Sequence, residues 1–175
     1  MEHHRGNFFL VGLMGAGKTT LGKPLAQSLG KTFLDADDEL EKREARSIPE
    51  IFAQNGEVFF REREEKLLRE FVRSENIVLA TGGGVVLREA NRTLLMENGT
   101  VVYLRATPEI LTQRLRHRQK NRPLLHDVDD MLERLQTLYR ERDSLYQQTA
   151  HIVFEEQSDE TLTSALATIQ ALLTR

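Results

Sequence analysis

The chain of 175 residues contains no cysteine, so disulfide bonds and thiolate metal sites are excluded. It also lacks an apolar run close to the roughly 20 residues that a membrane-spanning helix needs. Positive charge is not in excess, and the net charge of −3 argues against binding nucleic acid through a broadly basic surface. These absences predict a cytoplasmic protein with no membrane partner and no nucleic-acid partner.

Residues 1–14 are mildly basic and then apolar, which gives them a weak similarity to a signal peptide. The apolar run is short, and Lys18 follows without an Ala-x-Ala-like site, so we expect an intracellular protein. Hydrophobic residues make up 39% of the chain and charged residues 29%, as in ordinary globular proteins. The length predicts one domain over 1–175. No exposed apolar helix face stands out, so we expect a monomer.

The most informative stretch is residues 12–19, which read Gly-Leu-Met-Gly-Ala-Gly-Lys-Thr between an apolar run and a helix-like leucine stripe. Strand, glycine loop and helix together predict a phosphate-binding loop, because backbone N–H groups and the helix N-terminus can surround an anion. Lys18 would reach the β- and γ-phosphates, and the Thr19 hydroxyl would ligate Mg²⁺. The ATP-binding residues expected in this loop are Gly15, Ala16, Gly17, Lys18, Thr19 and Thr20.

Short apolar segments alternate with helix-like segments along the chain. The expected strands are 8–13, 32–34, 76–80, 101–104 and 151–154. The expected helices are 18–28, 38–45, a segment capped by Ser47, 57–72, 88–97, a segment opening at Thr107-Pro108, 129–147 and 158–173. This alternation predicts an α/β fold with three α/β/α layers and a five-stranded parallel sheet. Ligands of such sheets bind at the carboxyl ends of the strands.

Three predicted strands are followed by polar or glycine-rich segments that would meet at one edge of the sheet. After the glycine loop come Asp35 and Asp37: Asp35 could hold Mg²⁺ directly or through water, and Asp37 could orient or deprotonate an acceptor hydroxyl. Helix capping is the alternative for both acids. The consecutive Gly82, Gly83 and Gly84 favour close approach of the backbone to a ligand, with a flexible turn as the alternative.

Basic residues concentrate between 114 and 127, including Arg114 and Arg122. In a nucleotide-binding enzyme such a segment is typical of a lid that brings an arginine to the phosphates and excludes water. A solvated loop is the alternative, and a nucleic-acid patch is less suited because aromatic residues are not interleaved. Arg140 and Arg142 could reach an anionic acceptor, which would imply an acidic substrate. From spacing alone, a functional role of Arg61 cannot be chosen over the alternative that it is a solvated residue in a helix with internal charge pairs.

Six motifs in order resemble those of bacterial shikimate kinases over nearly the whole chain. They are the glycine loop 12–19, Asp-Ala-Asp at 35–37, Phe-Arg-Glu-Arg-Glu at 60–64, Thr-Gly-Gly-Gly at 81–84, Arg-Pro-Leu-Leu at 122–125 and Arg-Asp-Ser-Leu-Tyr at 142–146. The resemblance implies a P-loop fold of the nucleoside monophosphate kinase type. It also implies transfer of the γ-phosphoryl group of ATP to the 3-hydroxyl of shikimate, giving shikimate 3-phosphate in aromatic amino-acid biosynthesis.

The resemblance also implies roles for single residues. Asp37 would bind the ring hydroxyls and act as the candidate base, and Asp35 with Thr19 would lie at the metal. Arg61 and Arg142 would clamp the shikimate carboxylate against the wall formed by Gly82, Gly83 and Gly84. Lys18 would hold the phosphates and Arg122 would be the lid arginine over them, both as catalytic residues. Arg114 would contact phosphate or adenine. A substrate-binding lobe at about 37–64 and a mobile lid at about 115–127 are implied too.

One segment departs from the family pattern, because Glu155-Glu156-Gln157 stands where some members carry a more basic loop. Two other functions stay open at this point. One is a different P-loop kinase, for gluconate or a nucleoside monophosphate. The other is a nucleotide-dependent switch without catalysis, against which the intact Lys18, Asp37, Arg61, Arg122 and Arg142 count, because a switch needs no acceptor clamp.

Overall fold

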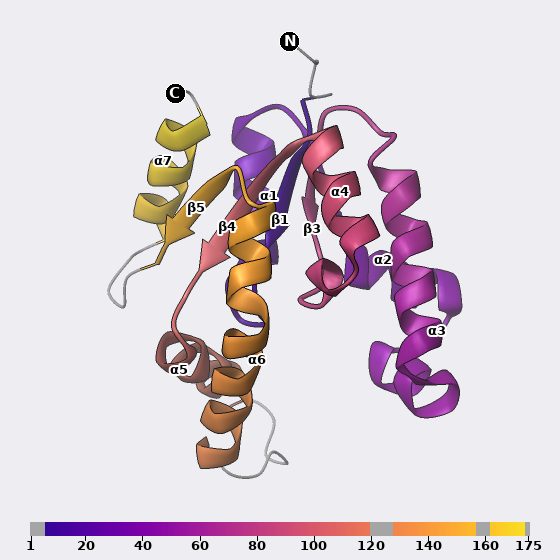
Figure 1. Cartoon of the computed structure of the whole chain (residues 1–175). Coiled ribbons are helices and arrows are strands. Elements are labelled where there is room, and N and C mark those ends of the chain that lie inside the picture. Colours follow the sequence, from indigo (N-terminus) through magenta and orange to yellow (C-terminus); the bar gives the residue numbers. More distant parts are fainter. Residues whose placement is uncertain (1–5, 120–127, 157–161, 174–175) are drawn as a thin grey trace.

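The computed structural model describes residues 6–119, 128–156 and 162–173 (Figure 1). Its elements are, in order, β1 (Phe8–Val11), α1 (Lys18–Ser28), β2 (Thr32–Asp35), α2 (Ala36–Glu44), α3 (Ile48–Phe71), β3 (Ile77–Ala80), the 3₁₀ turn η1 (Val85–Leu87), α4 (Glu89–Asn98), β4 (Thr100–Arg105), α5 (Pro108–Gln119), α6 (Val128–Thr149), β5 (Ile152–Glu155) and α7 (Leu162–Leu173). Every strand expected from the sequence is present, with small shifts at the ends.

The five strands form one parallel sheet in the order β2-β3-β1-β4-β5. The central strand β1 pairs on both sides, with Phe9 opposite Leu79 of β3 and Val101 of β4. All three side chains are fully buried, as expected for a parallel strand covered on both faces. The predicted five-stranded parallel sheet is therefore confirmed.

Helices cover both faces of this sheet, which gives the three predicted layers (Figure 1). On one face α1 packs against β2 and β3 and contacts α7, and on the other face α4 and α6 pack against β4. The order of the strands places β2, β3 and β1 next to one another. The loops that follow these three strands therefore lie together at one edge of the sheet.

The helix α3 is longer than expected, because two predicted segments join into one element. It begins at the predicted cap: Ser47 N donates to the Glu50 carboxylate at 2.7 Å, and the Ser47 hydroxyl accepts from Glu50 N. The backbone breaks at Gly56, with φ of 79° and ψ of 176°, and then continues to Phe71. The rings of Phe52 and Phe60 pack across the break with centroids 4.6 Å apart, which holds the kinked end against the rest of the helix.

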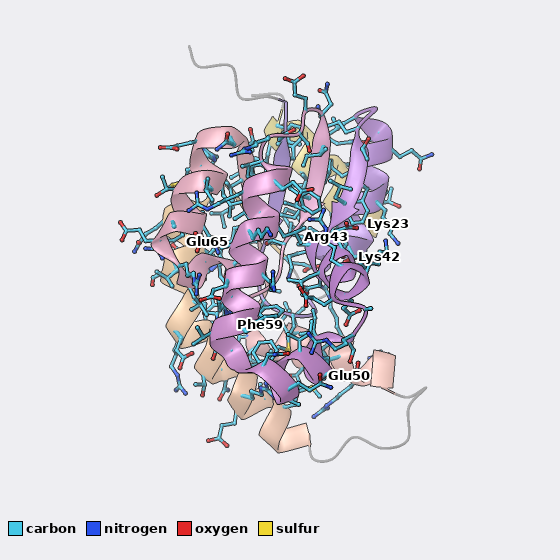
Figure 2. All side chains as sticks on the ribbon, turned by 90° about the vertical axis from the view of Figure 1, so that its right-hand side faces the viewer. Lys23, Lys42, Arg43, Glu50, Phe59 and Glu65 are labelled. Carbon is cyan, nitrogen blue, oxygen red and sulfur yellow. The ribbon has the colours of Figure 1, made fainter. Side chains whose placement is uncertain are left out.

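An arginine joins α2 to α3, the two elements that carry predicted acceptor residues. Arg43, which is labelled in Figure 2, lies on α2. It donates to both carboxylate oxygens of Glu70 at 2.7 and 2.8 Å and to Glu39 at 2.9 Å. The bidentate contact with Glu70 spans the two helices and therefore favours one orientation of α2 against α3.

The lid prediction is only partly covered by the structure. Residues 115–119 belong to α5, so the first part of the predicted lid is helical. Residues 120–127, with Arg122, lie outside the described residues. Among the described helices, none combines the length and the apolar character needed to cross a membrane.

Candidate active site

The phosphate-binding loop follows β1 and ends at the first residue of α1. Gly15 and Gly17 have φ angles of 82° and 91°, in the left-handed region that residues with a Cβ avoid. The Lys18 ammonium donates to the carbonyls of Gly12 and Leu13 at 2.7 and 3.0 Å, so it lies across the loop. Burial lowers the pKa of Lys18 to about 8, although the carboxylates of Asp37 and Asp35 oppose this shift.

Asp35 connects the phosphate-binding loop to α2. Its Oδ2 accepts a hydrogen bond from the Thr19 hydroxyl at 2.6 Å, and its Oδ1 accepts from the backbone of Asp37 and Asp38 at 3.0 and 3.2 Å. Asp35 is therefore the N-cap of α2, which confirms the capping interpretation, and it also faces the loop, while its role at a metal stays a prediction. The capping interpretation is wrong for Asp37, which lies in the first turn of α2.

Asp37 is a partly buried acid in a crowded electrostatic environment. Burial raises the pKa of Asp37 to about 6, with Asp35 adding to the shift and Lys18 opposing it. A Cβ built on Gly82 would lie 3.0 Å from Asp37 Oδ1, so the glycine turn after β3 passes directly over this carboxylate. An acid of this kind exchanges a proton close to neutral pH.

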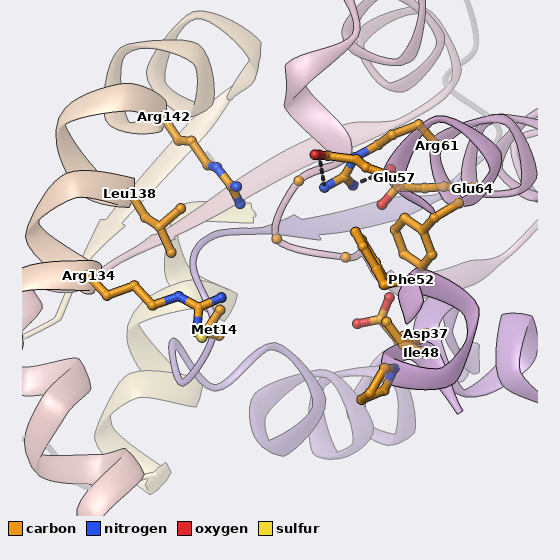
Figure 3. Close-up of a pocket in the computed structure, with 15 residues that line it drawn as sticks. Met14, Asp37, Ile48, Phe52, Glu57, Arg61, Glu64, Arg134, Leu138 and Arg142 are labelled. Atoms are coloured by element: carbon orange, nitrogen blue, oxygen red, sulfur yellow. Dashed lines mark hydrogen bonds and ion pairs between the residues drawn. The ribbon is translucent and has the colours of Figure 1, made fainter. Parts of the chain in front are cut away.

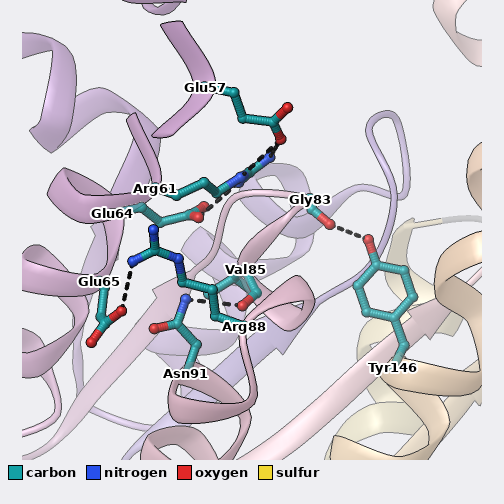
Figure 4. A network of polar contacts seen from close by, with 9 residues as sticks. All are labelled: Glu57, Arg61, Glu64, Glu65, Gly83, Val85, Arg88, Asn91 and Tyr146. Atoms are coloured by element: carbon teal, nitrogen blue, oxygen red, sulfur yellow. Dashed lines mark hydrogen bonds and ion pairs between the residues drawn. The ribbon is translucent and has the colours of Figure 1, made fainter. Parts of the chain in front are cut away.

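The glycine turn touches charged residues at each of its positions. A Cβ on Gly82 would lie 2.7 Å from Glu64 Oε1, and a Cβ on Gly84 would overlap the Arg61 guanidinium. The carbonyl of Gly83 accepts a hydrogen bond from the Tyr146 hydroxyl on α6 (Figure 4). Protein side chains therefore occupy the space that a Cβ would need at Gly82 and Gly84, which explains glycine there, whereas close approach of this turn to a ligand stays a prediction.

Arg61 is the arginine of α3 that turns inward. Its Nη1 donates to Glu64 Oε2 at 2.7 Å, and its Nε lies 3.4 Å from Glu57 Oε1, with only 12% of the side chain exposed (Figure 4). Its neighbour Arg63 faces outward and pairs with Glu44 at 3.3 Å, with 43% of the side chain exposed. The solvated-helix interpretation thus holds for Arg63 and not for Arg61.

Glu64 is a site residue to which the sequence assigned no role. Its Oε1 is buried without a hydrogen-bond partner in the described structure, and burial raises the pKa of this carboxyl while Arg61 opposes the shift. Its position three residues after Arg61 on a helix was the available signal, since such residues share a face. Beside it, Arg88 pairs with Glu65 at 2.8 Å and connects α3 to the segment before α4 (Figure 4).

These residues surround a cavity of about 560 Å³ (Figure 3). Arg61, Glu64 and Asp37 line one side, and Arg142 faces them from α6 (Figure 3). The Nε of Arg142 is buried with no partner in the described residues. The other lining residues are Met14, Ile48, Pro49, Phe52, Glu57, Phe60, the glycines 82–84, Arg134 and Leu138. A few charged groups over apolar side chains are typical of a small-molecule site.

The second arginine predicted near the acceptor does not line the cavity. Arg140 is exposed, and its guanidinium donates to the Thr137 hydroxyl on its own helix at 3.3 Å. Among the described residues of α6, the arginines that line the cavity are Arg142 and Arg134. Spacing of four residues places Arg134, Leu138 and Arg142 on one face of α6, whereas Arg140 lies on another.

Arg114 lies at the phosphate-binding loop but is held by an acid. Both of its terminal nitrogens donate to the Glu156 carboxylate, one of them at 2.6 Å, and one also lies 3.4 Å from the carbonyl oxygen of Gly15. The acidic segment after β5 therefore has a structural partner, because the buried Glu156 joins this strand end to α5.

The fold and the site define a P-loop kinase with an acceptor cavity suited to a small anionic molecule. Comparison with known proteins supports this class: the shikimate kinase family model matches residues 14–173. A shikimate kinase from Nitrosospira multiformis is 54% identical over 150 residues, which are 86% of this chain and 76% of that protein. The chain belongs to the shikimate kinase family.

Solved structures agree with this assignment. The shikimate kinase from Acinetobacter baumannii in complex with shikimate is 43% identical, with a TM-score of 0.84 over 97% of this chain and 91% of that one. A gluconokinase from Sinorhizobium meliloti has a TM-score of 0.56 at 15% identity, over 97% of this chain and 94% of that one. The gluconokinase therefore shares the fold alone.

Proposed function

We propose that this chain transfers the γ-phosphoryl group of ATP to the 3-hydroxyl of shikimate, giving ADP and shikimate 3-phosphate. The reaction serves chorismate and aromatic amino-acid biosynthesis. The observation that carries the proposal is the pair Arg61 and Arg142, which face each other across one cavity beside the phosphate-binding loop. Two guanidinium groups in this arrangement suit the single carboxylate of shikimate.

ATP is bound by the loop and by basic residues around it. The backbone of 15–20 and the Lys18 ammonium would hold the phosphates, for which Lys18 gives up its hydrogen bonds to Gly12 and Leu13. Arg114, next to Gly15, would contact phosphate or adenine. We also propose that residues at about 115–127 act as a lid, with Arg122 over the phosphates during transfer.

The residues at the loop fit a magnesium ion. Thr19 and Asp35 offer two oxygen atoms 2.6 Å apart at the start of α1, and magnesium prefers such oxygens. Within the described residues, no cluster of three or more acidic, histidine or cysteine side chains could hold a metal. This agrees with an ion held mainly by phosphate oxygens and water. When bound, Mg²⁺ neutralises charge on the β- and γ-phosphates.

Shikimate occupies the cavity between the proposed substrate lobe, about 37–64, and α6. Its carboxylate lies between Arg61 and Arg142, the backbone of Gly82, Gly83 and Gly84 forms the adjacent wall, and its 3-hydroxyl faces Asp37. Glu64 keeps the Arg61 guanidinium in place through the 2.7 Å contact. Without this acid, a flexible arginine would have to be ordered by the substrate, at a cost in binding free energy.

Transfer then needs one bond to form and one to break. The 3-hydroxyl oxygen attacks the γ-phosphorus as the bond to the β,γ-bridging oxygen breaks, and ADP leaves. The hydroxyl proton passes to Asp37, which is ionised at neutral pH and has a pKa of about 6. Lys18 and Arg122 stabilise the charge on the transferring group. All of these residues belong to one chain, so we propose that the monomer is the working unit, located in the cytoplasm.

The test is an ADP-release assay with shikimate, with gluconate and with no acceptor, on the wild type and two variants. R61A is expected to raise the KM for shikimate by about ten- to a hundredfold, the loss expected for one charge-assisted contact. Its KM for ATP should stay within about twofold, because Arg61 lies away from the loop.

The matched control is R63A, two residues away on the outer face of α3, which should leave both KM values unchanged. Equal rises in the two KM values of R61A would contradict the carboxylate role. Absence of shikimate-dependent ADP release in the wild type would contradict the activity itself.

A further inference from the structure

A third arginine, Arg134, lines the acceptor cavity and has no role in the scheme above. It projects from α6 on the same face as Leu138 and Arg142, two turns nearer the start of the helix (Figure 3). Eight residues of helix separate Arg134 from Arg142 by about 12 Å along the axis. The two guanidinium groups therefore serve different parts of the cavity.

The Arg134 end of the cavity is the end next to the phosphate-binding loop. The first half of α6 packs against α5, and Leu115 of α5 would be 3.2 Å from a Cβ on Gly15 of the loop. Met14 of the same loop lines the cavity together with Arg134 (Figure 3). Arg61 lies on the opposite side of the cavity from Arg134 (Figure 3). A ligand whose carboxylate lies at Arg61 thus extends toward Arg134 with its other end.

Arg134 differs from the other cavity arginines in its surroundings. Arg61 is mostly shielded from solvent and is bonded to Glu64 and Glu57, which offset part of its charge. Arg134 is exposed, and within the described part of the chain no hydrogen bond or ion pair to it is found. Its guanidinium is therefore available to an anion in the cavity.

The charges of the cavity change sharply during the reaction. Among the described residues, its lining contains three arginines and three acids, Asp37, Glu57 and Glu64, so the charges of these groups nearly cancel. Shikimate brings one negative charge, which the Arg61 and Arg142 pair matches. The product carries in addition a phosphate with a charge of about −1.5 to −2, bonded to the oxygen that faces the Asp37 carboxylate. Lys18 and Arg122 meet that group during transfer, and Arg134 is the arginine that lines the cavity beside Met14 of the loop and can meet the phosphate of the product.

We propose that Arg134 binds the phosphate of shikimate 3-phosphate and so forms a product-recognising subsite at the loop end of the acceptor cavity. The inference rests on the proposed function, because it assumes that the phosphate arises on the hydroxyl that faces Asp37. Arg134 is thus a binding residue for the transferred group, separate from the carboxylate clamp at Arg61 and Arg142.

The test measures the Kd values of shikimate and of shikimate 3-phosphate by calorimetry, without nucleotide, for the wild type, R134Q and R140Q. R140Q is the matched control, because it removes the same charge from an exposed arginine of the same helix that bonds only to Thr137 in the described structure. We expect R134Q to weaken product binding by about tenfold and shikimate binding by less than twofold. R134K should recover part of the loss, and 1 M salt should shrink it.

The deciding quantity is the ratio of the two Kd values. The inference would be overturned if this ratio were the same in R134Q and R140Q. This holds whether R134Q weakens the binding of both ligands equally or of neither. Circular dichroism melting of each variant checks that α6 is intact. ADP release by the wild type with shikimate is measured in parallel. If ADP release is absent, the proposed function is wrong. If ADP is released but the ratio of the two Kd values in R134Q equals that in R140Q, only the proposed Arg134 subsite is wrong.

Discussion

At the residue scale, Lys18, Asp37 and Glu64 are charged groups held away from water around one edge of the sheet. Burial acts on them in opposite directions, since it lowers the pKa of Lys18 to about 8 and raises the pKa values of both acids. Each therefore exchanges a proton more easily near neutral pH than an exposed group of its kind. Such perturbed groups gather where a site needs charges that can change.

The proposed role of Asp37 as the base can be tested through the pH dependence of the reaction. The proposed base must be ionised to accept the hydroxyl proton, and its pKa of about 6 lies above that of an exposed aspartate. As pH falls below about 6, Asp37 becomes protonated, so kcat/KM for shikimate should fall about tenfold per pH unit. Shikimate keeps its own charge here, because ordinary carboxyl groups titrate near pH 4.

The control is D37N, which should be slower by about a hundredfold or more and should lose this acidic limb of the profile. A steady-state pH series between 5 and 8 measures both enzymes. The base assignment would be refuted by an acidic limb that persists unchanged in D37N.

At the scale of elements, the turn between β3 and η1 is where helices α2, α3 and α6 meet. A Cβ built on any of its three glycines would lie within about 4 Å of a charged side chain. These side chains are Asp37 and Glu64 at Gly82, Arg142 at Gly83 and Arg61 at Gly84. The Tyr146 hydroxyl holds the middle of the turn, and the Tyr146 ring stacks on Tyr103 of β4 with centroids 4.8 Å apart. The turn therefore positions the acceptor cavity relative to the sheet.

Gly84 allows a substitution that separates function from stability. Its φ of −94° suits alanine, so G84A should melt within a few degrees of the wild type. The new methyl group would displace the Arg61 guanidinium, so the KM for shikimate should rise about tenfold or more with the KM for ATP unchanged.

G83A serves as the comparison, because its methyl group would meet its nearest neighbour at 3.6 Å, an ordinary contact. We expect a smaller rise in KM there. Steady-state kinetics and melting curves of both variants measure the difference. Loss of folding in G84A, or equal effects of the two substitutions, would contradict this explanation of the turn.

At the scale of the whole molecule, the parallel sheet carries two sites whose residues come from different helices, strands and loops. The phosphate-binding loop follows the central strand β1, while the acceptor cavity draws on α2, α3, the turn after β3 and α6. Arg61, Arg142 and Asp37 all line the cavity, and all three lie outside the proposed lid at about 115–127. Shikimate should therefore bind before the proposed lid closes.

This predicts that shikimate alone stabilises the protein. At a concentration of about 100 times its Kd, a ligand that binds only the folded state adds about 2.7 kcal/mol, which raises the Tm by about 5–10 °C for a chain of this size. The R61A variant should lose most of the shift, and gluconate should produce none. Differential scanning calorimetry without nucleotide measures these shifts. If shikimate stabilised the protein only after ADP was added, the cavity would not be preformed.

Local patterns were enough to predict much of this molecule from the sequence. The phosphate-binding loop depends on eight consecutive residues, and the Ser47–Glu50 cap depends on four, so neighbours in the chain carry the signal. Alternating apolar and helix-like segments predicted five parallel strands, because buried parallel strands and amphipathic helices have different periods. Chain order then placed the three functional loops at one edge.

The three-dimensional packing decided which of several equivalent charges form the site. Arg61 and Arg63 look alike in the sequence, as do Arg140 and Arg134, but helix rotation against the rest of the fold turns one of each pair toward the cavity. Likewise, only the packing of the glycine turn against α3 buries Glu64. Contacts between segments far apart in the chain leave no local pattern, so the tertiary structure alone determines them.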